Sequence, residues 1–134
     1  MLVDTGVLLA CLRPNDAWHA ECRELVRNAP LLLTTVAVLT ELFYFLHKQP
    51  WLLDPAWMLV RSGKVEMASL AQSDLPAVDA LMLKYGDRPM DFADATLVHV
   101  AGREGIADIL TIDHGDFETY RFGRNRKFRI APGR

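Results

Sequence analysis

The chain has 134 residues, of which 51 % are hydrophobic, enough for one domain with a single core. The start Met-Leu-Val-Asp has no basic segment before its acid, and three threonines and Glu41 interrupt the apolar run 31–46, so we expect neither a signal peptide nor a membrane span. The net charge of −2 excludes a strongly basic protein. Cys11 and Cys22 lack the spacing of metal ligands, so we expect them to be free thiols in a reducing cytoplasm.

Strands and helices are predicted to alternate along the chain. Strands are expected at residues 1–3, 31–34, 65–70 and 109–112, with an edge strand at 126–130. Helices are expected at residues 5–12, 17–28, 35–47, 54–62, 74–86 and 91–105, bounded by capping residues, proline or glycine. This alternation predicts an α/β fold with a parallel central sheet.

Acidic residues follow the first strand and the 109–112 strand. Asp4 comes directly after Met-Leu-Val, and Asp113 ends Ile-Leu-Thr-Ile-Asp. Open α/β sheets place their ligand sites beyond the carboxyl ends of strands, so these two carboxylates are predicted to meet at one sheet edge. Each has a simpler alternative, since Asp4 could cap the helix that follows and Asp113 could begin an Asx turn before His114-Gly115-Asp116.

Glu41 lies in a helix that is apolar on nearly all sides. Its neighbours on the same face carry no positive charge: they are Ala37, Val38, Tyr44 and Phe45. An apolar helix of this kind is expected to be buried, where an unpaired carboxylate is costly. The alternatives are that Glu41 extends to the surface or pairs with a distant arginine.

Asp91 and Asp94 are expected to share one face of the 91–105 helix. Two like charges about 4 Å apart repel by about 4 kcal/mol at an effective dielectric constant near 20, so both stay ionised only beside a cation. For Asp91 the alternative is a place in the first helical turn, which the helix dipole favours.

These acids predict a site for a hard divalent cation. Ligands that are all oxygen select Mg²⁺ or Mn²⁺, which bind phosphate through their remaining positions. The chemistry that follows is phosphodiester hydrolysis by a metal-oriented water. The triplet Asp4-Thr5-Gly6 also marks aspartic proteases, but the helical periodicity disfavours that class, and the four histidines show no ligand spacing.

The last residues of the chain are strongly basic. Residues 121–134 contain no acid and hold Arg121, Arg124, Arg126, Lys127, Arg129 and Arg134. A basic tail on an acidic body predicts contact with a polyanionic substrate, for which Arg121, Arg124, Arg126 and Lys127 are the candidates. A solubilising tail or a surface for an acidic partner is the alternative.

The order of these motifs resembles the PIN domain family, in particular the single-domain toxins of VapBC-type toxin–antitoxin pairs. The resemblance rests on Leu-Val-Asp-Thr-Gly-Val-Leu-Leu-Ala, Thr-Glu-Leu, Met-Asp-Phe-Ala-Asp-Ala-Thr-Leu-Val and Leu-Thr-Ile-Asp-His-Gly-Asp-Phe, and it spans nearly the whole chain. It implies that Asp4, Glu41, Asp94 and Asp113 bind the metal, with Thr5, Asp91 and Asp116 in support.

The resemblance further implies a three-layer α/β/α fold with a parallel sheet of four or five strands. It implies a Mg²⁺- or Mn²⁺-dependent endoribonuclease located in the cytoplasm, with an RNA substrate, a protein antitoxin and a homodimeric state. The alternative function is a catalytically quiet adaptor that binds RNA or protein. A partner surface is also expected where Trp51-Leu52-Leu53 is followed by Trp57 and Met58, unless these side chains belong to the core.

Overall fold

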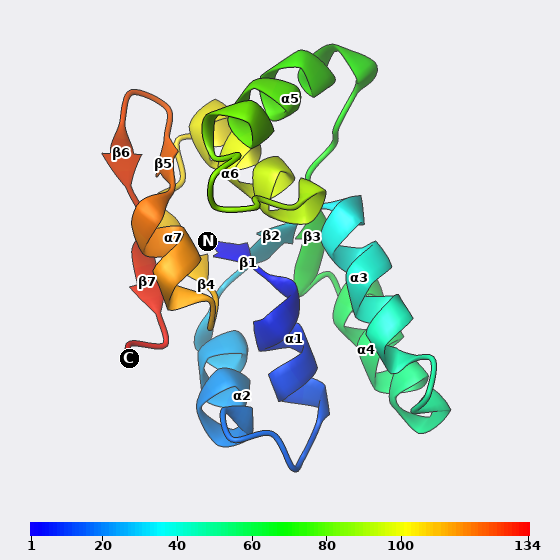
Figure 1. Cartoon of the computed structure of the whole chain (residues 1–134). Coiled ribbons are helices and arrows are strands. Elements are labelled where there is room, and N and C mark those ends of the chain that lie inside the picture. Colours follow the sequence, from blue (N-terminus) through cyan, green and yellow to red (C-terminus); the bar gives the residue numbers. More distant parts are fainter.

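Five short strands form a parallel sheet at the centre of the fold, in a computed structural model that describes residues 1–134 (Figure 1). The order across the sheet is β3-β2-β1-β4-β7, and every pair of neighbours is parallel. The strands are β1 (Leu2–Val3), β2 (Leu32–Thr34), β3 (Val65–Met67), β4 (Asp108–Leu110) and β7 (Arg129–Ala131). The predicted α/β fold with a central parallel sheet is confirmed.

Seven helices surround this sheet: α1 (Thr5–Leu12), α2 (His19–Asn28), α3 (Val36–Leu46), α4 (Leu53–Arg61), α5 (Leu75–Lys84), α6 (Phe92–Glu104) and α7 (His114–Thr119). Helices α5 and α6 lie over one side of the sheet, and α1, α2 and α4 lie on the other (Figure 1). Helix α3 contacts both α1 and α6. None of the helices combines the length and the apolar character needed to cross a membrane.

The strand order reverses beside β1, and this reversal positions the candidate site. From β1 the chain continues outward through β2 and β3, then returns through α5 and α6 to β4 on the other side of β1. Leu2 and Val3 are fully buried at this central position. The chain therefore leaves β1 and β4 side by side, at the kind of switch point where α/β proteins bind ligands.

Three predicted elements differ in the structure. The third strand ends at Met67 rather than at residue 70. The predicted edge strand 126–130 is divided: β6 (Arg126–Lys127) pairs antiparallel with β5 (Arg121–Phe122) in a hairpin, and β7 joins the central sheet. The turn expected after Asp113 is the short helix α7.

Helix α3 is less buried than its sequence predicts. Only Val38, Leu42 and Leu46 are buried, whereas Val36 and Tyr44 are 56 % and 68 % exposed. The helix packs mainly against α1 and α6, and the Phe43 ring contacts that of Trp57 in α4, which leaves the face with Val36 and Tyr44 exposed. Glu41 is accordingly half-buried at the margin of the packed face.

Candidate functional site

Carboxylates from separate segments line one small cavity beyond the carboxyl end of the sheet. The cavity has a volume of about 220 Å³, and its lining residues are Asp4, Thr5, Gly6, Leu9, Glu41, Phe45, Asp91, Asp94 and Asp113. Lysine, arginine and histidine are absent from this lining. The structure thus brings together the four acids predicted to bind metal, and it adds Asp91 to them.

Each acid is positioned by the start of a helix or by the face of one. Asp4 is the N-cap of α1, and its Oδ1 accepts a hydrogen bond of 2.8 Å from the backbone N–H of Thr5. Asp91 is the N-cap of α6, where its Oδ1 accepts from the N–H of Asp94, also at 2.8 Å. The capping alternatives for Asp4 and Asp91 therefore hold, but both side chains border the cavity as well.

Three hydroxyl groups orient the carboxylates. The Thr5 hydroxyl donates to Oε1 of Glu41 at 2.9 Å, which joins α1 to α3. The Thr111 hydroxyl donates to Oδ2 of Asp4 at 3.1 Å. The Tyr120 hydroxyl donates to Oδ2 of Asp94 at 3.2 Å. Neutral donors thus hold the carboxylates in place without neutralising their charge.

Thr111 and Tyr120 were not predicted as site residues. Thr111 accepts a hydrogen bond from the N–H of Asp113 at 3.0 Å while it donates to Asp4, so it fixes two acids at once. The sequence could have suggested Thr111 as a site residue, because it lies two residues before the predicted ligand Asp113. Tyr120 follows α7 and is fully buried against Tyr85 and Phe117, a placement that only the tertiary fold produces.

The electrostatics of the cavity favour protonated carboxyl groups. Burial raises the pKa of Asp4 to about 7, and the charges of Asp113 and Glu41 add to the effect. Burial likewise raises the pKa of Asp94 to about 8, with further contributions from Asp4 and Asp91. The pKa values of Glu41 and Asp113 are also raised, first by desolvation and then by neighbouring carboxylates. Like charges are crowded here without a compensating cation.

A family model described as PIN domain matches residues 1–123 of the chain. The chain belongs to the PIN domain family. Among curated proteins, no sequence matches it. Its fold also resembles those of solved structures from toxin systems.

One is a Mycobacterium tuberculosis protein, VapC20, described as a toxin that cleaves the sarcin-ricin loop. It aligns with a TM-score of 0.75 and 22 % identity, over 84 % of this chain and 89 % of that chain. The other is VapBC2 from Rickettsia felis, bound to a DNA fragment from its promoter, with a TM-score of 0.66, 15 % identity and 96 % coverage of each chain. Because both sequence identities are low, these comparisons show a similar fold and nothing more.

The donor set of this PIN domain suits a hard divalent cation. All the candidate ligands are carboxylate oxygens, the type that Mg²⁺ and Mn²⁺ prefer, and the shared cavity holds no side chain that competes for them. No three of these side chains are already arranged as ligands of a single ion. The fit therefore rests on the chemistry of the donors and on the uncompensated charge of Asp4 and Asp94.

Asp116 lies beside the acidic cavity but does not line it. Its Oδ1 accepts a hydrogen bond of 2.7 Å from Nη1 of Arg88, so an arginine compensates its charge. The two residues line a separate polar pocket of about 300 Å³, to which Asp113 also belongs. Asp116 is thus a neighbour of the carboxylate group and not a member of it.

The basic residues near the end of this PIN domain lie in a hairpin that does not border the acidic cavity. Strands β5 and β6 pack beside the C-terminal half of α6, where Gly123 approaches Gly102. The Arg121 guanidinium donates to the backbone oxygens of Glu118, Thr119 and Tyr120, at the end of α7. Arg126 lies over the ring of Phe122, and Arg124 and Lys127 are exposed.

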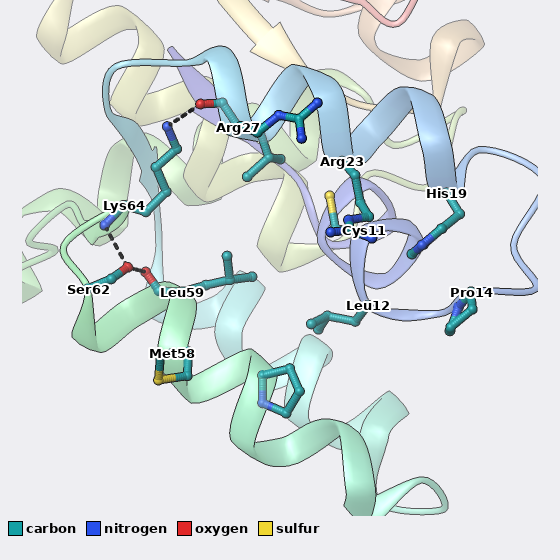
Figure 2. Close-up of a pocket in the computed structure, with 12 residues that line it drawn as sticks. Cys11, Leu12, Pro14, His19, Arg23, Arg27, Met58, Leu59, Ser62 and Lys64 are labelled. Atoms are coloured by element: carbon teal, nitrogen blue, oxygen red, sulfur yellow. Dashed lines mark hydrogen bonds between the residues drawn. The ribbon is translucent and has the colours of Figure 1, made fainter.

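The largest groove of the molecule lies elsewhere, between α1, α2 and α4 (Figure 2). It has a volume of about 570 Å³. Leu12 of α1 and Met58 and Leu59 of α4 contribute apolar side chains, and Arg23 and Arg27 of α2 stand along the opposite side (Figure 2). No acid lines this groove. Its apolar and basic lining differs from the acidic cavity, so the molecule has two chemically distinct concave surfaces.

Proposed function

We propose that this PIN domain is a divalent-metal-dependent endoribonuclease and the toxin of a type II toxin–antitoxin pair. The observation that carries the proposal is the cluster of five carboxylates in one cavity without a basic side chain. A cluster of this kind is costly for a protein that does not bind a cation. Membership of the PIN domain family and the likeness to toxin folds support the same conclusion.

In this mechanism Asp4, Glu41, Asp94 and Asp113 hold Mg²⁺ or Mn²⁺. The bound ion supplies a polarised water and neutralises charge on the phosphate during hydrolysis. Thr5 holds the Glu41 carboxylate toward the cavity, and Thr111 does the same for Asp4. Asp91 adds negative charge at the rim and so strengthens attraction for the cation.

Contacts with the RNA backbone are assigned to the β5–β6 hairpin. Arg124 and Lys127 are exposed, and Arg126 is exposed over the Phe122 ring, so all three are available to phosphates. Arg121 contributes less, because Nη1 of its guanidinium donates to three carbonyl groups at the end of α7, which holds the side chain in place. The hairpin would contact a part of the RNA remote from the cleaved bond.

The alternative function is a quiet adaptor that binds RNA or protein without cleaving it. An adaptor has no use for buried, unpaired carboxylates, and mutation would be free to replace them with neutral residues. All four predicted ligands are present and line one cavity, which favours the enzyme.

The antitoxin of the proposed pair would bind the groove between α1, α2 and α4. The apolar floor suits the apolar face of an amphipathic helix, and the basic rim with no acid in the lining suits acidic flanking residues. A neighbouring gene for a small DNA-binding protein would support the toxin role. Arg23→Glu should weaken the complex between the toxin and that protein once both are purified. Unchanged affinity of the Arg23→Glu variant would contradict the groove as the binding site.

The decisive experiment is RNA cleavage by the purified protein with Mg²⁺ or Mn²⁺. Transfer RNA, messenger RNA and a ribosomal stem-loop of the sarcin-ricin type are the substrates to compare. Asp4→Asn and Asp94→Asn should abolish cleavage, whereas Asp79→Asn, on the exposed face of α5, should not. Cleavage that persists in both site variants, or in excess EDTA, would rule out the proposed centre.

A further inference from the structure

Arg88 lies beside the acidic cavity, in the loop between α5 and α6. It lines the polar pocket of about 300 Å³ together with Ile112, Asp113, His114, Gly115, Asp116 and Arg134. Asp113 lines this pocket and the acidic cavity alike. The two hollows therefore share a wall, and a strand of RNA whose cleaved bond lies at the acids would extend across the pocket.

The guanidinium of Arg88 retains donors that the protein does not use. Its Nη1 donates to Asp116, and the structure gives its other nitrogens no acceptor. Gly115 leaves the group uncovered, since a Cβ at that position would lie 3.6 Å from Nη1. The side chain is 45 % exposed. An anion that enters the pocket would thus meet free N–H groups.

Arg134 lines the same pocket but already has a bidentate partner. Its Nε and Nη2 donate to the two carboxylate oxygens of Glu118, each at 2.8 Å. A bidentate pair of this geometry uses the fork that would otherwise bind a phosphate. Of the two arginines, Arg88 is held by a single hydrogen bond, so its guanidinium is the less restricted in turning toward a new anionic partner.

We propose that Arg88 is a positioning residue that binds an RNA phosphate next to the cleaved bond. The inference rests on the proposed nuclease function and extends it to the site of substrate contact. The lining of the acidic cavity offers phosphates no cationic side chain, so a nearby guanidinium supplies the attraction that the carboxylates lack. The Arg88–Asp116 pair is exposed on both sides and adds little to folding stability, which leaves substrate binding as its main use.

The test measures binding of a short single-stranded RNA by fluorescence anisotropy, with Mg²⁺ present and in an Asp94→Asn background that prevents cleavage. Arg88→Ala should weaken binding about tenfold, as expected for loss of a charge-assisted hydrogen bond. It should also reduce the slope of log K against log salt by about 0.7, the value for one phosphate contact. Arg88→Lys should restore the slope.

Two further variants separate this role from general electrostatics. Arg134→Ala removes the same charge from the same pocket and should leave the slope unchanged. Asp116→Asn releases Arg88 and should tighten binding, whereas a purely structural ion pair predicts no gain. Equal effects of Arg88→Ala and Arg134→Ala, or an unchanged slope in Arg88→Ala, would overturn the assignment.

Cleavage kinetics without the Asp94→Asn change distinguish the two proposals. A phosphate contact that is made equally in the bound substrate and the transition state raises KM and leaves kcat unchanged, which is the expected result for Arg88→Ala. If the wild type cleaves RNA and Arg88→Ala has an unaltered KM, the phosphate site is refuted and the nuclease stands. If the wild type neither binds nor cleaves RNA, both proposals fail.

Discussion

The hydroxyl of Thr111 donates a hydrogen bond of 3.1 Å to the Asp4 carboxylate, although the two residues are 107 positions apart. The same hydroxyl accepts from the backbone N–H of Asp113. One buried side chain thus links the end of β1 to the segment after β4, and it sets the relative position of two candidate ligands.

Replacing Thr111 by valine should disturb both ligands while retaining the shape of the side chain. The N–H of Asp113 and one oxygen of Asp4 lose their partner, so we expect a loss of about 1–3 kcal/mol in the free energy of unfolding. RNA cleavage should fall by more than tenfold. Urea denaturation and a cleavage assay measure the two effects, and Thr40→Val on the exposed side of α3 is the control, since its hydroxyl bonds only to its own helix. Wild-type cleavage by Thr111→Val would contradict the positioning role.

Neutralising Asp94 should stabilise the metal-free protein. Asp94 is only 8 % exposed and lies near Asp4 and Asp91, so its ionised form is unfavourable at pH 8. We expect Asp94→Asn to raise the free energy of unfolding by on the order of 1–2 kcal/mol in EDTA. Thermal unfolding with and without EDTA measures the change, with Asp79→Asn as the control of equal charge. A lower melting temperature for Asp94→Asn would show that the carboxylate is paired after all.

The stability of the metal-free protein should decrease as the pH rises from about 4 to about 8. In the lower part of this window Asp4 and Asp94 are protonated in the folded state, whereas the unfolded chain has already released these protons. The folded protein releases them only as the pH passes the raised pKa values of about 7 and about 8. Because the folded state binds more protons, the free energy of unfolding falls with increasing pH. Unfolding in EDTA at pH 5.5 and pH 8 tests this, and saturating Mn²⁺ should remove most of the difference. A free energy of unfolding that increases between pH 5.5 and pH 8 would show that burial and mutual repulsion do not raise the pKa values of these carboxyl groups.

We expect the exposed tryptophans to form the interface with a second copy of the chain. Trp51 and Trp57 are 69 % and 47 % exposed, and the Trp57 ring lies 4.6 Å from that of Phe43. Leu52, between them, is buried in the core. The double variant Trp51→Asp, Trp57→Asp should therefore fold and elute as a monomer, while the wild type elutes as a dimer in light-scattering measurements. An unchanged mass of the double variant would refute this interface.

The sequence predicted the sheet edge well, because strand ends and helix starts are encoded locally. The short apolar runs before Asp4 and Asp113 predict where these acids lie, and the predicted start of α3 at residue 35 agrees with its observed N-cap, Thr35. Asp74 directly precedes α5, yet its side chain does not cap that helix and instead accepts hydrogen bonds from the N–H of Ala71 and from His99. His99, which lies 25 residues away in the sequence, competes for the Asp74 carboxylate, and the local sequence pattern around Asp74 does not predict this contact.

Other features depended on packing between distant segments. The apolar composition of α3 predicted burial, yet Tyr44 remains exposed because no element covers that face. Residues 126–130 were predicted as one strand, but the chain leaves the hairpin at Phe128 and begins β7 beside β4. The hydroxyl partner of Asp94 is Tyr120, which lies at the end of α7 and comes near Asp94 only through the tertiary fold.

The reversal of strand order beside β1 also has a consequence during synthesis. Asp4 is synthesised before the neighbours of β1 on its second side, and Thr111, which lies 107 positions later, emerges from the ribosome together with Asp113 only after β2, β3 and the helices between them. A nascent chain that has reached α5 holds some of the acids but lacks the segment that closes them into a cavity. The proposed nuclease centre is therefore incomplete until the segment that follows β4 has been synthesised.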